Sequence, residues 1–157
     1  MKPYDTIIIG AGPVGSRVAY KLAQLNYKVA VLDKKAVLGD DVCCTGILSK
    51  ECLDTFNINT DLILRESGSA KFFSPSGKCL RLWRDSPVAA IVDRHALDRS
   101  LAKQAQEAGA NYLFGVRVTD IRIEPDIVET TVDNQGEGAT LRAKTAVIAT
   151  GFSSNLP

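Results

Sequence analysis

The stretch TIIIGAGPVG, residues 6–15, decides the fold of this chain. A short β-branched run that stops at a glycine is typical of a buried strand, here predicted over 4–9. Pro13 suits the first turn of a helix, because its missing N–H leaves no bond unmade there. A second apolar run predicts another strand over 28–32. Strand, helix and strand in this order form a βαβ unit, which predicts a parallel sheet.

Three glycines in this stretch, Gly10, Gly12 and Gly15, form the pattern G-x-G-x-x-G. The first allows a tight turn, the second lets a pyrophosphate approach the backbone, and the third lets the helix pack on the strand. The helix N-terminus also attracts anions. Asp33 follows the second strand, where its carboxylate can accept hydrogen bonds from a ribose diol and would repel a 2′-phosphate. The pattern predicts a dinucleotide site and disfavours NADP there, but leaves NAD and FAD open.

The remainder of the chain predicts an α/β fold in which a Rossmann-like parallel sheet is joined by an antiparallel crossover sheet. We expect one dinucleotide-binding domain over 1–157 with a hairpin insertion at about 66–92. The further expected elements are a short helix at 49–55, hairpin strands at 69–73 and 79–83, a strand at 89–92, a helix at 94–108, and strands at 112–114, 116–123, 127–133 and 146–149.

Composition excludes several classes of protein. The formal net charge is +1, which lacks the basic excess that nucleic-acid binding needs. No apolar run approaches the length of a membrane span, and the first residues lack the pattern of a signal peptide. Cys43, Cys44, Cys52 and Cys79 have neither zinc-site spacing nor a disulfide framework, so we expect no metal and free thiols in a reducing cytoplasm.

Four stretches resemble a known family. YDTIIIGAGPVGSRVAYKLAQLNYKVAVLDK (4–34) resembles the start of FAD-dependent oxidoreductases with a two-dinucleotide-binding-domain fold, and among these the geranylgeranyl reductase family. DDVCCTGILSK (40–50) resembles that family's cysteine loop, and VDRHALDRSLAKQAQEAGA (92–110) resembles its arginine helix. VIATGFSS (147–154) resembles the A-T-G strand end. Asp33 stands where the family usually has Glu.

The resemblance implies a set of FAD-binding residues, which are Gly10, Gly12, Pro13, Val14, Gly15, Asp33, Lys34, Cys43, Cys44, Gly46, Arg94, Val118, Thr150 and Gly151. Cys44 would lie against the isoalloxazine and is the catalytic candidate, or else it is a small buried apolar residue. Arg94 would lie near the flavin, or else it is a surface residue paired with Asp98. Val118 would contact the adenine through its backbone.

The resemblance also implies a reaction, in which reduced FAD delivers hydride to a carbon–carbon double bond of an isoprenoid lipid or other small molecule. NAD(P)H or another external donor would reduce the flavin, and a lipid substrate implies peripheral contact with a membrane. Chains of this family continue past the A-T-G element into a substrate portion, so we expect an N-terminal, truncated piece of such an enzyme. The alternatives are a flavin-dependent aromatic hydroxylase or halogenase, and a catalytically inert dinucleotide-binding fragment.

Three further expectations concern packing. Helical spacing predicts that Val14, Val18, Leu22 and Leu25 form the buried face of the first helix. His95, the only histidine, is expected at the surface. The aromatic residues Phe72, Phe73 and Trp83 are expected in the core or in a sheet on the substrate side.

Overall fold

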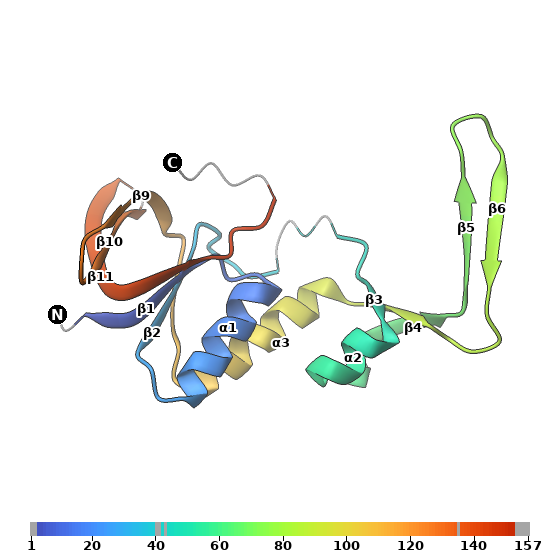
Figure 1. The fold of residues 1–157 in the computed structure, drawn as a ribbon, viewed down its shortest axis with the longest axis horizontal. Helices are drawn as coiled ribbons and strands as arrows, with labels where there is room; N and C mark the ends of the chain where they lie inside the picture. Colours follow the sequence, from blue (N-terminus) through green and yellow to red (C-terminus); the bar gives the residue numbers. More distant parts are fainter. Residues whose placement is uncertain (1–2, 40–41, 43, 135, 153–157) are drawn as a thin grey trace. The chain divides into compact units, whose positions relative to one another are not determined.

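The computed structural model describes residues 3–39, 42, 44–134 and 136–152. These residues form two compact units, each described here by itself (Figure 1). The first unit consists of Met1–Asp40 and Asp98–Pro157, and the second of Asp41–Leu97. The predicted dinucleotide motif lies in the first unit, and the predicted hairpin lies in the second.

The first unit contains β1 (Tyr4–Ile9), α1 (Pro13–Gln24), β2 (Val29–Asp33), β8 (Asn111–Phe114), β9 (Arg117–Ile123), β10 (Val128–Asn134) and β11 (Glu137–Ile148). The second contains β3 (Ile47–Ser49), α2 (Lys50–Phe56), the 3-10 turn η1 (Thr60–Leu62), β4 (Ile63–Ser67), β5 (Ser69–Phe73), β6 (Cys79–Trp83) and β7 (Ala89–Val92). The boundary between the units falls within α3 (Arg94–Glu107).

A six-stranded sheet in the order β8-β2-β1-β11-β10-β9 organises the first unit. Strands β8, β2, β1 and β11 are parallel neighbours, whereas β10 pairs antiparallel with both β11 and β9. The long strand β11 joins the two parts, since Ala143 is opposite Val128 of β10 and opposite Tyr4 of β1. This arrangement confirms the predicted parallel sheet with its antiparallel extension.

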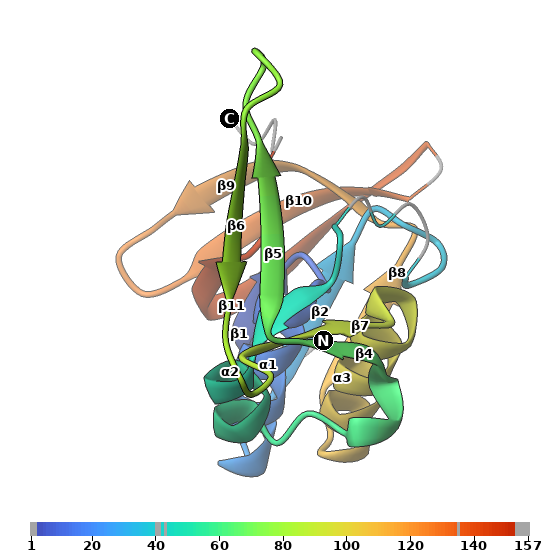
Figure 2. The same ribbon diagram turned by 90° about the vertical axis from the view of Figure 1, so that its right-hand side faces the viewer.

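Strand alternation divides the core of the first unit between the two faces of the sheet. Ile7 and Ile9 belong to one buried cluster, which Val132 of β10 also joins. Ile8 points to the opposite face and belongs to a second cluster with small residues of α1 and α3, such as Ala19 and Ala105. Figures 1 and 2 show α1 and α3 side by side on that face.

The buried face of α1 differs from the predicted one. Its buried residues are Gly15, Ser16, Ala19 and Ala23. Val14 and Leu25 are each 67% exposed. The helix approaches β1 so closely at Gly15 that only small side chains fit between helix and sheet. Val18 and Leu22 are partly buried and pack against the second cluster, so the prediction from hydrophobic spacing is wrong only at Val14 and Leu25, which are turned toward solvent.

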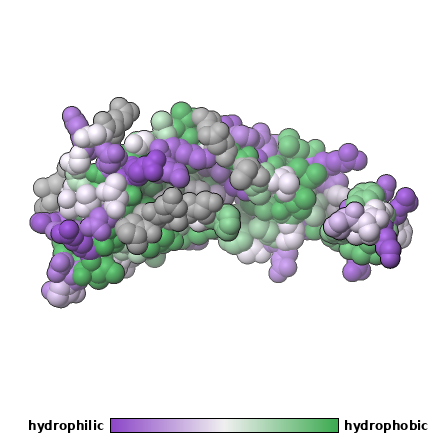
Figure 3. Space-filling model, turned by 90° about the horizontal axis from the view of Figure 1, so that it is seen from above, coloured by the Kyte–Doolittle hydropathy of each residue, from purple (hydrophilic) through white to green (hydrophobic). Residues whose placement is uncertain are grey.

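The second unit has a three-stranded sheet, β3-β7-β4, and a separate hairpin formed by β5 and β6 (Figure 2). The hairpin confirms the prediction for 69–73 and 79–83. Phe72, Phe73 and Trp83 are each more than half exposed, so of the two alternatives for them the core is wrong. They lie in the β5–β6 sheet, and its place beside a substrate stays a prediction. Figure 3 shows apolar (green) and polar (purple) residues together on the hairpin. A two-stranded sheet has no second layer of its own to cover such side chains.

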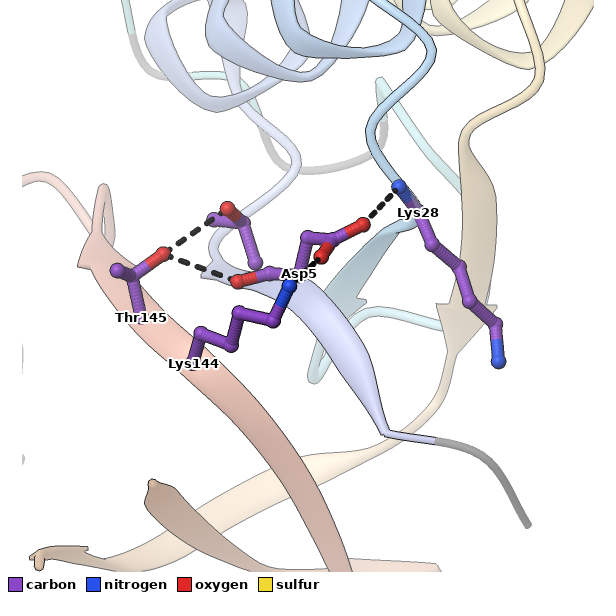
Figure 4. Close-up of polar contacts among 5 residues, drawn as sticks. Asp5, Lys28, Lys144 and Thr145 are labelled. Atoms are coloured by element: carbon purple, nitrogen blue, oxygen red, sulfur yellow. Dashed lines mark hydrogen bonds and ion pairs between the residues drawn. The ribbon is translucent and has the colours of Figure 1, made fainter. Parts of the chain in front are cut away.

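Asp5 connects β1 with β11 and with Lys28, the residue before β2 (Figure 4). Its carboxylate accepts a hydrogen bond from Lys144 Nζ of β11 at 2.7 Å and another from the Lys28 N–H at 2.9 Å. Its backbone oxygen accepts a hydrogen bond from the Thr145 hydroxyl at 3.2 Å. The hydrogen bond from Lys144 is the main cause that lowers the pKa of Asp5 below its usual 3.8, and the same pair raises the pKa of Lys144.

The lowered pKa of Asp5 predicts a loss of stability in acid. The carboxylate contributes stability that is present above pH 3.8 and is lost as the pH falls through the lower pKa of the folded state. In Asp5→Asn this acid-dependent loss should be absent, as measured by denaturant unfolding between pH 5 and pH 2. Asp126→Asn, in the exposed turn after β9, is the control and should keep the wild-type pH dependence. An unchanged pH profile in Asp5→Asn would show that the contact contributes nothing.

Thr130 of β10 carries a buried hydroxyl that has no hydrogen-bond partner among the described residues. Replacing it with valine keeps the shape and removes the unsatisfied group, so Thr130→Val should stabilise the protein by about 1 kcal/mol. Thr6→Val is the matched control, because the Thr6 hydroxyl is paired with that of Thr145 at 2.9 Å and its loss should destabilise. Urea unfolding measures the free energy of unfolding of both variants. Equal changes in the two variants would refute the assignment of the Thr130 hydroxyl as unpaired.

Candidate functional site

The predicted phosphate-binding turn lies at the carboxyl ends of three parallel strands. The Gly10 N–H donates to Leu32 O of β2, and the Ala149 N–H donates to Ile9 O of β1. A Cβ at Gly10 would overlap the Ala149 carbonyl oxygen and lie 3.1 Å from Thr150 Cα. The structure therefore brings the turn after β1 together with the ends of β2 and β11. In parallel α/β sheets, ligands bind at this edge.

The three glycines have different surroundings. Gly10 has φ +109°, a conformation that side chains rarely adopt. A Cβ on Gly15 would overlap the Gly10 carbonyl oxygen, so the helix packs directly on the turn. A Cβ on Gly12 would meet no described atom within 4 Å. Gly10 and Gly15 are thus required by packing inside the protein, whereas Gly12 borders open space.

The beginning of α1 has the character of an anion-binding site. Gly12 is the N-cap, makes no side-chain capping bond, and is followed by Pro13 in the first turn. The first turn contains no acidic residue, and Val14 within it is exposed. Helix N-terminal N–H groups and the helix dipole favour a bound anion. The open space at Gly12 therefore lies beside the beginning of α1, and binding of a diphosphate there stays a prediction.

Asp33 makes two backbone contacts that the sequence did not predict. Its Oδ2 accepts a hydrogen bond from the Ala11 N–H at 2.7 Å, and its Oδ1 accepts one from the Lys35 N–H at 2.9 Å. The side chain therefore fixes the turn after β1, residues 10–12 (the glycine turn), to the end of β2. Each carboxylate oxygen can accept a second hydrogen bond, so binding of a ribose diol by Asp33 stays a prediction.

Two residues that sequence reasoning missed support the turn from within. The Ser16 hydroxyl donates to the Ala11 carbonyl at 3.0 Å, and the Tyr112 hydroxyl of β8 donates to Ser16 Oγ at 3.0 Å. Ser16 is fully buried, and burial raises the pKa of Tyr112 above its usual 10.0. The available signal was a polar residue directly after Gly15, on the face of α1 that meets the sheet.

The other predicted residues of the first unit have varied positions. Lys34 is exposed directly after β2. Val118 is half-buried on β9 and packs against the core cluster that includes Ile7. Thr150 and Gly151 follow β11, and Gly151 has φ +74°. Their contacts with a cofactor stay predictions.

Four predicted residues belong to the second unit. Cys44 is exposed, so the alternative that it is a buried apolar residue is wrong. Gly46 has φ +73°, accepts a hydrogen bond from the Val92 N–H at 2.9 Å, and has no room for a Cβ beside Val92 O. The same Cβ would lie 3.1 Å from Cγ of Arg94, which begins α3. Cys43 lies outside the described residues.

The beginning of α3 bears on two further predictions. The Asp93 carboxylate accepts a hydrogen bond from the Ala96 N–H at 3.0 Å, which caps the helix. His95 is exposed, as predicted. Asp98 is buried, so the surface position in the alternative for Arg94 is wrong for Asp98, and the pairing of the two residues stays a prediction. In the part of the chain that the structure describes, no helix combines the length and apolar character that crossing a membrane requires.

Comparison with known proteins agrees with this geometry. Residues 4–157 match the family described as pyridine nucleotide-disulphide oxidoreductase. A curated relative, digeranylgeranylglycerophospholipid reductase of Methanosarcina acetivorans, is 31% identical over 158 residues, which cover 98% of this chain and 39% of the relative. The chain thus spans about two fifths of the length of that relative.

Solved structures show the same fold. A geranylgeranyl bacteriochlorophyll reductase-like protein from Thermoplasma acidophilum has a TM-score of 0.87 at 28% identity, covering 99% of this chain and 41% of that protein. The p-nitrophenol 4-monooxygenase of Pseudomonas putida has a TM-score of 0.80 at 17% identity, covering 98% of this chain and 42% of the monooxygenase, which shows a shared fold alone. The chain therefore belongs to the pyridine nucleotide-disulphide oxidoreductase family, and its similarity to geranylgeranyl reductases and to FAD-dependent oxidoreductases, predicted from its motifs, is confirmed.

Proposed function

We propose that this chain forms the FAD-binding part of a reductase that saturates carbon–carbon double bonds of a geranylgeranyl-type isoprenoid. The observation that carries the proposal is the open space at Gly12, in front of the uncapped beginning of α1. It supports a bound dinucleotide because a diphosphate needs close approach to the backbone there. The names of the relatives, which share a geranylgeranyl group, support the substrate class.

The first unit would hold the ADP half of the cofactor. Gly12 and the first turn of α1 would bind the diphosphate, and Asp33 would accept hydrogen bonds from the adenosine ribose through its remaining lone pairs. Val118 would contact the adenine through its backbone. Thr150 and Gly151, which follow β11, would border the cofactor, because a glycine at a strand end permits close approach.

The residues of the second unit would serve the flavin. Cys44, which is exposed, would line the side of the isoalloxazine where the substrate reacts. Gly46 and Arg94 pack together at the beginning of α3 and would hold that loop in place. FAD, when bound, supplies hydride transfer, while the protein orients the cofactor and excludes competing reactions. NAD(P)H or another external donor would supply the electrons.

The substrate proposal is tested by mass spectrometry. The purified chain with FAD and dithionite under anaerobic conditions is incubated separately with digeranylgeranylglycerophospholipid vesicles and with geranylgeranyl diphosphate. We expect products that gain two hydrogen atoms for each reduced double bond, with loss of activity in Gly12→Ala. Sedimentation with the lipid vesicles, compared with vesicles of saturated lipid, tests the peripheral membrane contact that a lipid substrate would require.

Two other outcomes distinguish the alternatives. A product that gains an oxygen atom from an aromatic substrate, in air with NAD(P)H, would replace the reductase proposal with a hydroxylase. A folded chain that binds FAD stoichiometrically but converts neither isoprenoid would identify a dinucleotide-binding module without activity of its own. Either result would overturn the proposed reaction for this chain.

A further inference from the structure

We propose that Ser16 and Tyr112 are positioning residues that direct the Gly12 N–H toward the diphosphate of the bound dinucleotide. The inference rests on the proposed function of the glycine turn, and it assigns to one buried and one partly buried hydroxyl group a role in phosphate binding. The Tyr112 hydroxyl donates to Ser16 Oγ, and the Ser16 hydroxyl donates to the Ala11 carbonyl, each at 3.0 Å.

The two peptide groups that flank Ala11 are both held by side chains. The Ala11 N–H, in the peptide shared with Gly10, donates to Asp33 Oδ2 at 2.7 Å. The Ala11 carbonyl, in the peptide shared with Gly12, accepts from Ser16. These two peptides are therefore held by side chains, whereas the Gly10 N–H before them is held by Leu32 O of β2. Removing either side chain releases one defined peptide group.

The geometry of the peptide bond determines the direction in which the Gly12 N–H points. In a planar trans peptide the carbonyl and the N–H point in opposite directions. The chain has no cis peptide bonds among its described residues. Because the Ala11 carbonyl points inward to fully buried Ser16, the Gly12 N–H points away from the core. A Cβ on Gly12 would meet no described atom within 4 Å, so open space borders this residue.

The preceding peptide agrees with this geometry. The Ala11 N–H points to Asp33, so the Gly10 carbonyl of the same peptide points the opposite way. That carbonyl lies where a Cβ on Gly15 would be, directly against α1. Asp33 and Ser16 thus hold two successive peptides whose carbonyls both face α1, at Gly15 and at Ser16, and the Gly12 N–H is directed away from Ser16. Fixing a donor before the ligand arrives lowers the cost of binding.

Tyr112 supports the orientation of the Ser16 hydroxyl. Its hydroxyl occupies one acceptor site of Ser16 Oγ and thereby leaves the Ser16 proton directed at the Ala11 carbonyl. A tyrosine hydroxyl with its usual pKa of 10.0 is protonated, and so able to donate, at neutral pH, and partial burial raises the pKa of Tyr112 further. Loss of the Tyr112 hydroxyl should therefore weaken the orientation of the turn less than loss of the Ser16 hydroxyl.

The test compares Ser16→Ala, Tyr112→Phe and a matched control. Tyr20→Phe removes a hydroxyl from the same helix, where it accepts an exposed hydrogen bond from Gln24 at 2.7 Å, away from the turn. The first readout is the ¹⁵N order parameter of the Gly12 N–H without ligand, expected near 0.85 in the wild type and below about 0.6 in Ser16→Ala. The second is ADP affinity by calorimetry, expected to fall about tenfold in Ser16→Ala and about threefold in Tyr112→Phe.

The outcomes separate this inference from the proposed function. A rigid Gly12 N–H in both variants, or a loosened one with unchanged ADP affinity, overturns the positioning role. A wild type that binds no ADP refutes the dinucleotide site, while the order parameters still decide whether Ser16 holds the peptide. If Ser16→Ala fails to fold, Tyr112→Phe carries both measurements, because it leaves the buried serine in place. Equal effects in Tyr20→Phe would point to general loosening of α1 and overturn the inference.

Discussion

Gly15→Ala is expected to destabilise the folded protein by about 3 kcal/mol, although glycine to alanine within a helix ordinarily stabilises by about 1 kcal/mol. The reversal follows from the added Cβ, which would overlap the Gly10 carbonyl oxygen. That oxygen belongs to a turn fixed by the hydrogen bonds of Gly10 to Leu32 and of Ala11 to Asp33. Helix α1 would have to move away from β1, which would open the core cluster that contains Ile8 and Ala19.

Urea denaturation followed by circular dichroism measures this effect. Gly12→Ala is the matched control, since it is the same substitution at the same turn but adds a Cβ where no described atom lies within 4 Å. A Gly15→Ala variant as stable as the wild type would mean that the turn at Gly10 shifts at little cost in free energy to admit the added Cβ. The close approach of α1 to β1 would then not constrain the choice of residue at this position.

Gly12→Ala is expected to leave the fold intact and to weaken dinucleotide binding strongly. Gly12 has φ −65° and ψ −177°, which any residue adopts, so the stability should change by less than about 1 kcal/mol. The new methyl group would project into the space proposed for the diphosphate, so the affinity for FAD and ADP should fall at least about tenfold. Calorimetric titration with each ligand measures the loss.

The control for this prediction is Leu25→Ala, which shortens an exposed side chain at the opposite end of α1 without adding atoms near Gly12. It should leave FAD affinity nearly unchanged. Wild-type affinity in Gly12→Ala would show that the ligand does not approach the backbone at this glycine. The diphosphate would then have to be sought elsewhere on the unit.

The strands and helices that surround the dinucleotide motif were predictable because each has a local signal. Ile7, Ile8 and Ile9 mark a strand buried on both faces, and Pro13 marks the beginning of α1. The extent of β11 was not predictable in this way. Only its apolar end at 146–149 has the pattern of a buried strand, whereas its beginning at Glu137 is largely exposed and acquires its structure by pairing with β10.

The errors in packing have one physical cause. The hydrophobicity of a residue does not determine which atoms its side chain contacts in the folded chain. Val14 has the spacing of a core residue, but the side of α1 that packs most closely on the sheet contains Gly15, and Val14 is exposed. Phe72 and Trp83 are apolar enough for a core, yet they lie on a two-stranded hairpin with no covering layer of its own.

The candidate site was predictable in its residue types and not in its hydrogen bonds. The pattern of glycines identified the turn, and Asp33 was expected to serve a ligand. Its contact with the Ala11 N–H depends on the distance between the ends of β1 and β2, which no single motif encodes. Ser16 and Tyr112 are 96 residues apart and meet only because β8 pairs with β2.

The decisive measurement is a titration of the purified 157-residue chain with FAD, followed by gel filtration and release of bound flavin by denaturation. We predict stoichiometric FAD in the wild type and little or none in Gly12→Ala, with both proteins folded by circular dichroism. A folded wild type that retains no FAD and gives no calorimetric signal with ADP would contradict a dinucleotide site at Gly12. Equal FAD retention by wild type and Gly12→Ala would contradict it as well.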